Sequence, residues 1–258
     1  MVKGKVYIVG AGPGDAELIT LKGKRAIEEA DVIFYDRLIN KDLLAYAKKD
    51  AILVYAGKEP NNHTIKQEEL NQLLVLHAQR GKVVTRLKGG DPFIYGRGSE
   101  EAETLAQHDI AFEIVPGISA GIAAPAYAGI PVTHRHVSNG FTIITGHDQS
   151  IEETNWKLFV QEKHTLIIYM GMKNLPKIIG KLMEEGIDTN TPVALIQWGT
   201  TEEQKTVTGS LQNIVLQAES HQISNPAIIL IGEVARFHQS LDWFNPSNWR
   251  LGIIKCLQ

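Results

Sequence analysis

Short apolar runs alternate with polar, helix-like stretches along this chain, and this alternation constrains the fold more than any other feature. Residues 6–9 and 32–35 have the length and composition of buried strands, whereas residues 18–29 and 67–79 have helical character. Strands that alternate with helices form parallel sheets whose faces the helices cover. We therefore predict an α/β fold whose N-terminal sheet is mostly parallel. Further strands are expected at residues 52–55, 83–87 and 112–115, and a further helix at residues 100–107.

The second half of the chain predicts a mixed sheet. The expected strands are residues 141–145, 165–169, 193–197, 205–208 and 227–231, and the expected helices are residues 118–128, 175–185 and 211–218. A short link at residues 199–204 favours an antiparallel pair between the strands that flank it. Pro125 should end or kink its helix. Because Pro116 and Gly117 interrupt the pattern, we expect an N-terminal α/β domain at residues 1–115 and a C-terminal α/β domain at residues 116–258, with a short C-terminal extension.

Composition is that of a globular protein and argues against several classes. The chain has 258 residues, of which 43% are hydrophobic, and a formal net charge of -3, without the basic excess of a nucleic-acid binder. It contains no run of 18 apolar residues, so no membrane span is expected. Residues 1–9 lack the features of a signal peptide, and a cytoplasmic location is expected. The single cysteine, Cys256, excludes an internal disulfide and a multi-cysteine metal site.

The first glycine-rich turn, residues 10–15, stands between a strand and a helix, where nucleotide-binding turns occur. A dinucleotide pattern would need glycine in place of Asp15, and Pro13 removes one backbone donor from an anion-binding nest. Both features weaken the binding of an anion, but neither harms the binding of a cation such as a sulfonium. Asp36 ends the next strand, where a ribose-binding acid would stand. A dehydrogenase and a purely structural turn therefore stay open as alternatives at this point.

The second loop, residues 86–101 (RLKGGDPFIYGRGSEE), is more informative. Five of its residues are glycine or proline, so the backbone must turn sharply at a strand end, where ligands bind in open α/β sheets. Ser99 is expected to cap the helix that begins near Glu100. Residues 93–95 form an apolar segment with a buried character between two turn clusters. This pattern favours a ligand-binding loop over a structural one.

Several stretches of the sequence resemble the tetrapyrrole methylases and occur in the order typical of that family. They are VGAGPGD (9–15), DVIFYDRL (31–38), RLKGGDPFIYGRG (86–98), PGISAGIAAPAYAGIPVTHR (116–135), TGH (145–147), IIYMG (167–171), PVALIQWGTT (192–201) and NPAIILIGEV (225–234). The long third and fourth stretches are highly specific, whereas TGH alone means little.

The resemblance implies a fold, a reaction and a set of site residues. It implies two α/β domains with the active site in the trough between them, a homodimer, and S-adenosylmethionine as the cofactor, converted to S-adenosylhomocysteine without a metal. The implied reaction adds two methyl groups, at C2 and C7 of uroporphyrinogen III, and gives precorrin-2 for sirohaem or cobalamin biosynthesis. Asp36 and Lys58 are the expected proton acceptor and proton donor. The expected cofactor contacts are Pro13, Gly89, Gly90, Asp91, Ile94, Ser119, Ala120, Met170 and Gly199.

A substrate with eight carboxylates requires local positive charge in a chain that is acidic overall. The basic residues beside the motif loops that can pair with carboxylates are Arg37, Arg86, Arg97, His134 and Arg135. The sequence departs from the family pattern at Ser99, where glycine is expected, and at Glu59, where a basic residue is expected. Another enzyme of the same fold and a non-catalytic tetrapyrrole-binding protein are the alternatives. The intact Asp36, Lys58 and cofactor loops argue against the second.

Overall fold

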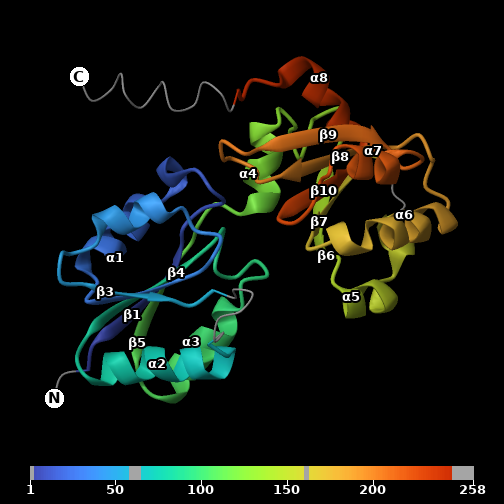
Figure 1. Ribbon diagram of the computed structural model, residues 1–258. Coiled ribbons are helices and arrows are strands. Elements are labelled where there is room, and N and C mark those ends of the chain that lie inside the picture. The colour runs from blue at the N-terminus through green and yellow to red at the C-terminus, as the bar shows by residue number, and fades with distance from the viewer. Residues whose placement is uncertain (1–2, 58–64, 160–162, 246–258) are drawn as a thin grey trace, which may run out of the picture. The chain divides into compact units, whose positions relative to one another are not determined.

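The computed structural model describes residues 3–57, 65–159 and 163–245. The chain divides into two compact units, Met1–Ala120 and Gly121–Gln258. Each unit is built on a five-stranded sheet with its own layers of helices (Figure 1).

The sheet of the N-terminal unit is entirely parallel, as the alternating pattern predicts. Its strands lie in the order β3 (Ile52–Tyr55), β2 (Val32–Tyr35), β4 (Val83–Lys88), β1 (Lys5–Gly10) and β5 (Ala111–Val115). Each observed strand contains the predicted one and extends it by at most two residues. Strands β2 and β3 consist of apolar and aromatic residues, as is typical where helices cover both faces of a sheet, whereas the central strand β4 also carries Thr85, Arg86 and Lys88.

Successive residues of β4 point to opposite faces of this sheet. Val84 packs with helices α2 (Gln67–Gln79) and α3 (Gly98–Gln107), whereas Leu87 packs with α1 (Leu21–Glu29) and the short helix η2 (Lys41–Tyr46). Figure 1 shows α1 on one side of the sheet and α2 and α3 on the other. Full burial of a side chain such as Leu74 contributes about 1.5–3 kcal/mol to stability, so both layers hold the strand ends in place.

The first predicted helix is divided in two. A 3-10 turn, η1 (Ala16–Leu18), precedes α1, which begins at Leu21. The hydroxyl of Thr20 accepts the N–H of Gly23, and this cap fixes the start of α1. The prediction of one helix over residues 18–29 therefore missed the capping residue.

The C-terminal unit contains the predicted mixed sheet. Its strands lie in the order β6 (Gly140–Thr145), β7 (His164–Tyr169), β10 (Ala227–Ile231), β8 (Pro192–Gln197) and β9 (Lys205–Ser210). Strands β6 and β7 are parallel, and the other neighbours are antiparallel. Strands β8 and β9 form the antiparallel pair that the short link at residues 199–204 predicted.

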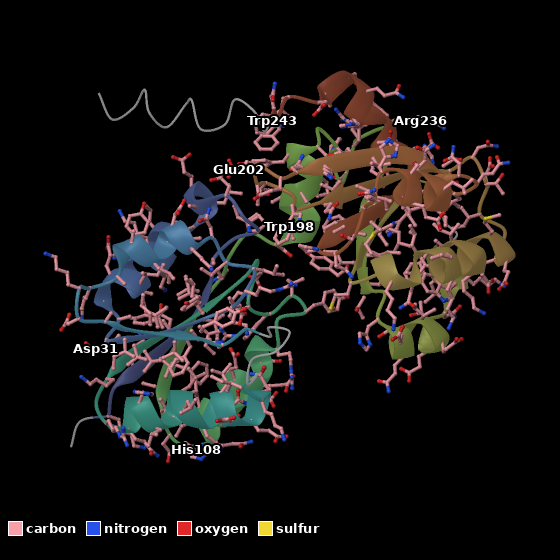
Figure 2. The ribbon with its side chains drawn as sticks, viewed as in Figure 1. Asp31, His108, Trp198, Glu202, Arg236 and Trp243 are labelled. Atoms are coloured by element: carbon pink, nitrogen blue, oxygen red, sulfur yellow. The ribbon has the colours of Figure 1, made fainter. Side chains whose placement is uncertain are left out.

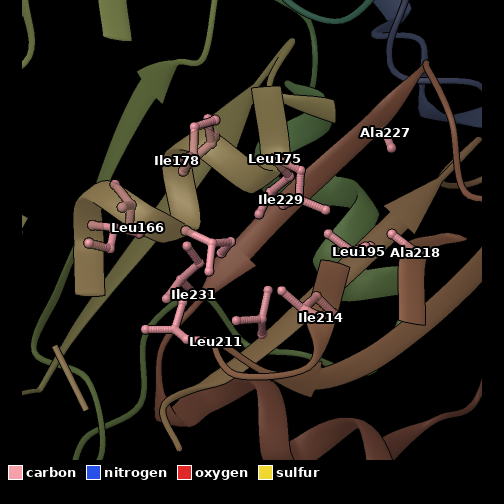
Figure 3. Packing of buried hydrophobic residues seen from close by; sticks show 14 of the residues in the cluster. Leu166, Leu175, Ile178, Leu195, Leu211, Ile214, Ala218, Ala227, Ile229 and Ile231 are labelled. Carbon is pink, nitrogen blue, oxygen red and sulfur yellow. The ribbon is translucent and has the colours of Figure 1, made fainter. Parts of the chain in front are cut away.

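Helices surround this second sheet. They are α4 (Ala120–Tyr127), α5 (Asp148–Glu153), η3 (Trp156–Phe159), η4 (Met172–Asn174), α6 (Leu175–Glu184), α7 (Ile214–Ser220), η5 (Glu233–Phe237) and α8 (His238–Leu241). Figure 3 shows the core in which Ile178 of α6 and Ile214 of α7 pack with side chains of the sheet, among them Leu195 and Ile229. Helix α4 continues two residues beyond Pro125, so the proline does not end it.

The residues after Ala235 pack on α4 as far as the structure describes them. The indole N–H of Trp243 donates to the carbonyl of Ala126 at 2.9 Å, and the ring of Tyr127 contacts the rings of Trp243 and Phe244. Cys256 lies outside the described residues. Within the described ranges, no helix has the length and apolar character needed to cross a membrane.

Candidate functional site

Two glycine-rich turns are joined by backbone hydrogen bonds at the carboxyl edge of the N-terminal sheet. The N–H of Ala11 donates to the carbonyl of Lys88 at 2.7 Å. Gly12 and Gly90 then exchange two hydrogen bonds, at 3.2 and 2.7 Å, and both have a positive φ (79° and 67°). Glycine adopts this conformation at little cost, so the two turns can run side by side where strands β1 and β4 end.

A third backbone segment, which follows β5, closes this cluster of turns. A Cβ atom on Gly10 would lie 2.6 Å from the Cα of Gly117, and one on Gly117 would lie 2.3 Å from the carbonyl oxygen of Gly90. Only glycine allows so close an approach. The result is a cradle of main chain, made by Gly10, Gly90 and Gly117, which we call the glycine cradle.

Asp91 ties the second turn to the third. One of its carboxylate oxygens accepts the N–H of Phe93 at 2.9 Å, and the other accepts the N–H of Gly117 at 3.0 Å. The turn positions predicted as cofactor contacts are therefore adjacent in this unit, since a Cβ atom on Gly90 would lie 3.8 Å from the backbone nitrogen of Ala120 and 4.0 Å from the Cα of Ser119. Gly89 packs against Leu38, and Pro13 follows Gly12 in the first turn.

The tip of the loop differs from the sequence expectation. Phe93, Ile94 and Tyr95 are exposed rather than buried, and Tyr95 has a positive φ. Helix α3 begins at Gly98, so Ser99 lies inside its first turn and does not cap it. The φ of Ser99 is not positive, and a side chain is therefore tolerated where the family has glycine.

Asp36 belongs to a network of charged side chains beside the glycine cradle. The guanidinium of Arg86 donates to the carboxylate of Asp36, and its Nε donates to Glu101 Oε1 at 3.0 Å. The ammonium of Lys88 donates to the same oxygen at 2.9 Å. Arg86, Lys88 and Glu101 are at most 3% exposed, whereas Asp36 is 29% exposed. Asp36 is thus the one member of the group that solvent reaches readily.

Burial and charge act on the two cations of this network in different ways. Burial lowers the pKa of Arg86, but the carboxylates of Asp36 and Glu101 outweigh that effect and raise the pKa above its ordinary value. Burial and the neighbouring guanidinium lower the pKa of Lys88, although Glu101 opposes them.

The other basic candidates are spread over both units. Arg97 has a positive φ and pairs with Glu100, at 2.8 Å from its Nε and 2.6 Å from its Nη2. Arg37 and Arg135 are exposed, and the ring of His134 lies against Phe237 with a centroid distance of 4.7 Å. Lys58 and Glu59 lie outside the described residues.

Two loops of the C-terminal unit hold non-glycine residues in the left-handed conformation. Met170, which follows β7, has a φ of 56° and is 47% exposed. Gly199, which follows β8, lies between Trp198 (φ 49°, labelled in Figure 2) and Thr200 (φ 70°). Such conformations cost about 1–3 kcal/mol each and concentrate at functional sites. The two predicted contacts in this unit therefore lie in strained loops.

Helix α4 packs closely on the loop at Gly199 and on the last residue of β7. A Cβ atom on Gly199 would lie 2.4 Å from the Cβ of Ala124, and the N–H of Gly121 donates to the hydroxyl oxygen of Tyr169. Tyr169, Lys88 and Glu101 were not singled out by sequence reasoning. The available signal was the pair of charges at alternate positions of a buried strand, Arg86 and Lys88, which share one face.

Within the described ranges, no group of three or more His, Cys, Asp or Glu side chains is arranged to hold a metal ion. The fold and its loops define a class of protein: two α/β units, the first a parallel sheet with a glycine cradle at its carboxyl edge, the second a mixed sheet with strained loops.

Comparison with known proteins assigns the family. The model of the tetrapyrrole (corrin/porphyrin) methylases matches residues 5–215, and the chain belongs to that family. It is 58% identical over 236 residues to the uroporphyrinogen-III C-methyltransferase of Priestia megaterium, which covers 91% of this chain and 99% of that one.

Two solved structures are similar throughout. The first is a uroporphyrin-III C-methyltransferase from Thermus thermophilus complexed with S-adenosylhomocysteine, at a TM-score of 0.76 and 35% identity, covering 90% of this chain and 94% of that one. The second is a cobalt precorrin-4 methyltransferase of cobalamin biosynthesis, at a TM-score of 0.80 and 27% identity, covering 90% of this chain and 95% of that one.

Proposed function

We propose that this chain is an S-adenosylmethionine-dependent C-methyltransferase that adds two methyl groups, at C2 and C7, to uroporphyrinogen III. The product would be precorrin-2, for sirohaem or cobalamin biosynthesis. The observation that carries this proposal is the 58% identity to a relative of that name along nearly its whole length. A methyltransferase of later cobalamin steps has the same fold but only 27% identity, which favours the first activity.

The side chains of the first glycine-rich turn suit a cationic nucleoside better than an anion. The first turn, residues 10–15, contains no basic side chain, and the carboxylate of Asp15 accepts the N–H of Glu17 within its own turn. Such a surface offers an anion little. The residues proposed to hold S-adenosylmethionine are Pro13, Gly89, Gly90, Asp91, Ile94, Ser119 and Ala120 of the N-terminal unit, and Met170 and Gly199 of the C-terminal unit. The cofactor supplies an electrophilic methyl group on its sulfonium.

Asp36 is the proposed proton acceptor. A pyrrole carbon that attacks a methyl group leaves its ring cationic, and the ring must then lose a proton. Asp36 stands at the carboxyl end of β2, part exposed, and Arg86 holds its carboxylate. Lys58 is the proposed proton donor. The transfer itself depends on positioning, and it requires no metal.

Arg37, Arg97, His134 and Arg135 are proposed to bind the carboxylates of the substrate. Three of them are exposed and His134 is partly buried, so charge-assisted hydrogen bonds to a ligand are available to them. Arg86 is buried and its guanidinium already binds two protein carboxylates, so we assign it another role below. We also propose that the enzyme acts as a homodimer in the cytoplasm; light scattering of the purified protein tests the oligomeric state.

Incubation with methyl-labelled S-adenosylmethionine and uroporphyrinogen III tests the reaction. We expect a product that carries two labelled methyl groups by mass spectrometry, formed equally well after treatment with a metal chelator. Asp36→Asn is the matched variant, which should bind S-adenosylmethionine normally but turn over about 100- to 10,000-fold more slowly. A wild-type protein that forms no dimethylated product, or that methylates only a later precorrin, contradicts the proposal.

A further inference from the structure

The buried part of the charged network has no place in the reaction as proposed so far. We propose that Arg86 is a positioning residue that fixes the carboxylate of Asp36, and that Glu101 in turn holds Arg86. This inference rests on the proposed function, in which Asp36 accepts the proton.

The position of Arg86 in the sheet explains its reach to Asp36. It pairs in register with Phe34 of β2, and Asp36 follows two residues later. The N–H of Asp36 donates to the carbonyl of Leu87 at 3.2 Å, so a backbone hydrogen bond to β4 holds Asp36 next to Arg86. The side chain and main chain of Asp36 are therefore both held by β4.

The guanidinium has a single orientation because each of its nitrogens has a partner. Nη2 donates to Asp36, and Nε donates to Glu101 at 3.0 Å. Nη1 donates to the carbonyl oxygens of Leu87 and Phe34, at 3.2 and 3.4 Å. A planar fork fixed at every nitrogen can orient a carboxylate in a way that a flexible ammonium cannot.

Glu101 is the centre of this arrangement. Its Oε1 accepts hydrogen bonds from Arg86, from Lys88 at 2.9 Å and from Gln67 at 3.1 Å. Its other oxygen is buried and has no hydrogen-bond partner among the described residues. A carboxylate buried in this way is expensive, and apolar side chains of similar volume often serve stability as well or better. Stability alone is therefore a poor explanation for the network.

The same network lies beneath the cofactor loop. A Cβ atom on Gly96 would lie 3.4 Å from the Cε of Lys88, so the side-chain carbons of Lys88 pack against this loop. The ammonium of Lys88 donates to Glu101, and Lys88 therefore connects the loop to Glu101. Glu101 itself stands in the first turn of α3, at the end of that loop. Through Arg86 and Lys88 it places the proposed proton acceptor and the proposed cofactor loop in one rigid frame.

A variant that preserves charge balance tests the role of Arg86. Arg86→Met combined with Glu101→Gln removes one buried cation and one buried anion together, and leaves Lys88 and Asp36 to balance each other. We expect kcat for methyl transfer to fall by on the order of 100-fold, while the KM for uroporphyrinogen III stays unchanged. Arg236→Gln is the control, because that guanidinium pairs with Glu233 on the surface of the other unit (Figure 2); it should leave kcat unchanged.

The decisive measurement repeats the change in the Asp36→Asn background. If Arg86 acts through Asp36, the triple variant is no slower than Asp36→Asn alone; a loss that multiplies in that background overturns the proposal. Should the double variant not fold, Arg86→Lys decides: it keeps the charge but not the fork, and a wild-type kcat for it overturns the proposal equally. A wild-type enzyme without dimethylated product refutes the proposed function instead, so the two failures are distinguishable.

Discussion

Asp91 and Gly117 join two segments that are far apart in the sequence: the carboxylate of Asp91 accepts the N–H of Gly117 at 3.0 Å. Its other oxygen accepts the N–H of Phe93, so a single side chain holds both the loop after β4 and the turn after β5. Hydrogen bonds to a charged acceptor contribute about 1.5–3 kcal/mol each. The shape of the glycine cradle thus depends on this carboxylate.

From this relationship we predict that Asp91→Ala weakens the binding of S-adenosylmethionine at least about tenfold, which corresponds to the loss of about 1.4 kcal/mol. Asp91→Asn keeps one acceptor oxygen and should lose less. Titration calorimetry measures both, with Glu103→Ala, an exposed position of α3, as the control. Unchanged affinity in Asp91→Ala would show that the loop does not hold the cofactor.

The close approach of Gly10 and Gly117 leads to a prediction on stability. Gly117→Ala places a methyl group 2.3 Å from the carbonyl oxygen of Gly90, and backbone must move to admit it. We expect a destabilisation of about 1–3 kcal/mol in denaturant unfolding. Gly180→Ala is the matched control, because a Cβ there meets nothing within 4 Å and lies in helix α6. It should stabilise the protein by about 0.5–1 kcal/mol.

Acid should weaken the N-terminal unit through Glu113, whose carboxylate pairs with Lys5 and Lys22. These partners lower the pKa of Glu113 from 4.5 to about 2. A lowered pKa contributes stability that is complete above about pH 4.5 and is lost as the pH falls through about 2. Unfolding free energies of the wild type and Glu113→Gln should therefore converge across that interval. A constant difference between the two proteins over the interval would contradict this assignment, and added salt should reduce the effect.

Much of the fold follows from the sequence because its signals are local. The strands at Val32–Tyr35, Ile52–Tyr55 and Ala227–Ile231 and the helix at Gln67–Gln79 are observed at the predicted residues, and both sheets have the predicted type. Helix α5, the short helix η2 and the division before α1 were missed. The starts of α1 and η2 depend on side-chain caps, Thr20 and Asn40, rather than on hydrophobic periodicity, whereas α5 is a short helix without such a cap.

The candidate site was predictable only in part. The glycines of the cradle are visible as a pattern, but the contact between Gly10 and Gly117 arises from the parallel pairing of β1 with β5. Arg86 was interpreted as a substrate contact because a sequence does not report burial. Its pairing with Asp36 and Glu101 joins three separate elements: the register of β2 and β4 brings Asp36 to Arg86, and the packing of α3 brings Glu101.

Met170 offers a test in which stability and binding should change in opposite directions. Its φ of 56° is unfavourable for a residue with a side chain, by about 1–2 kcal/mol, but not for glycine. Met170→Gly relieves that strain, although the added freedom of the unfolded chain offsets part of the gain, and we expect stability to rise by up to about 1 kcal/mol. If the side chain contacts the cofactor, as proposed, the same change weakens the binding of S-adenosylmethionine. Thermal unfolding and calorimetry of one protein sample measure both effects. If the variant is more stable and binds S-adenosylmethionine equally well, the positive φ is required only by the turn of the main chain after β7. Met170 would then be removed from the proposed cofactor site.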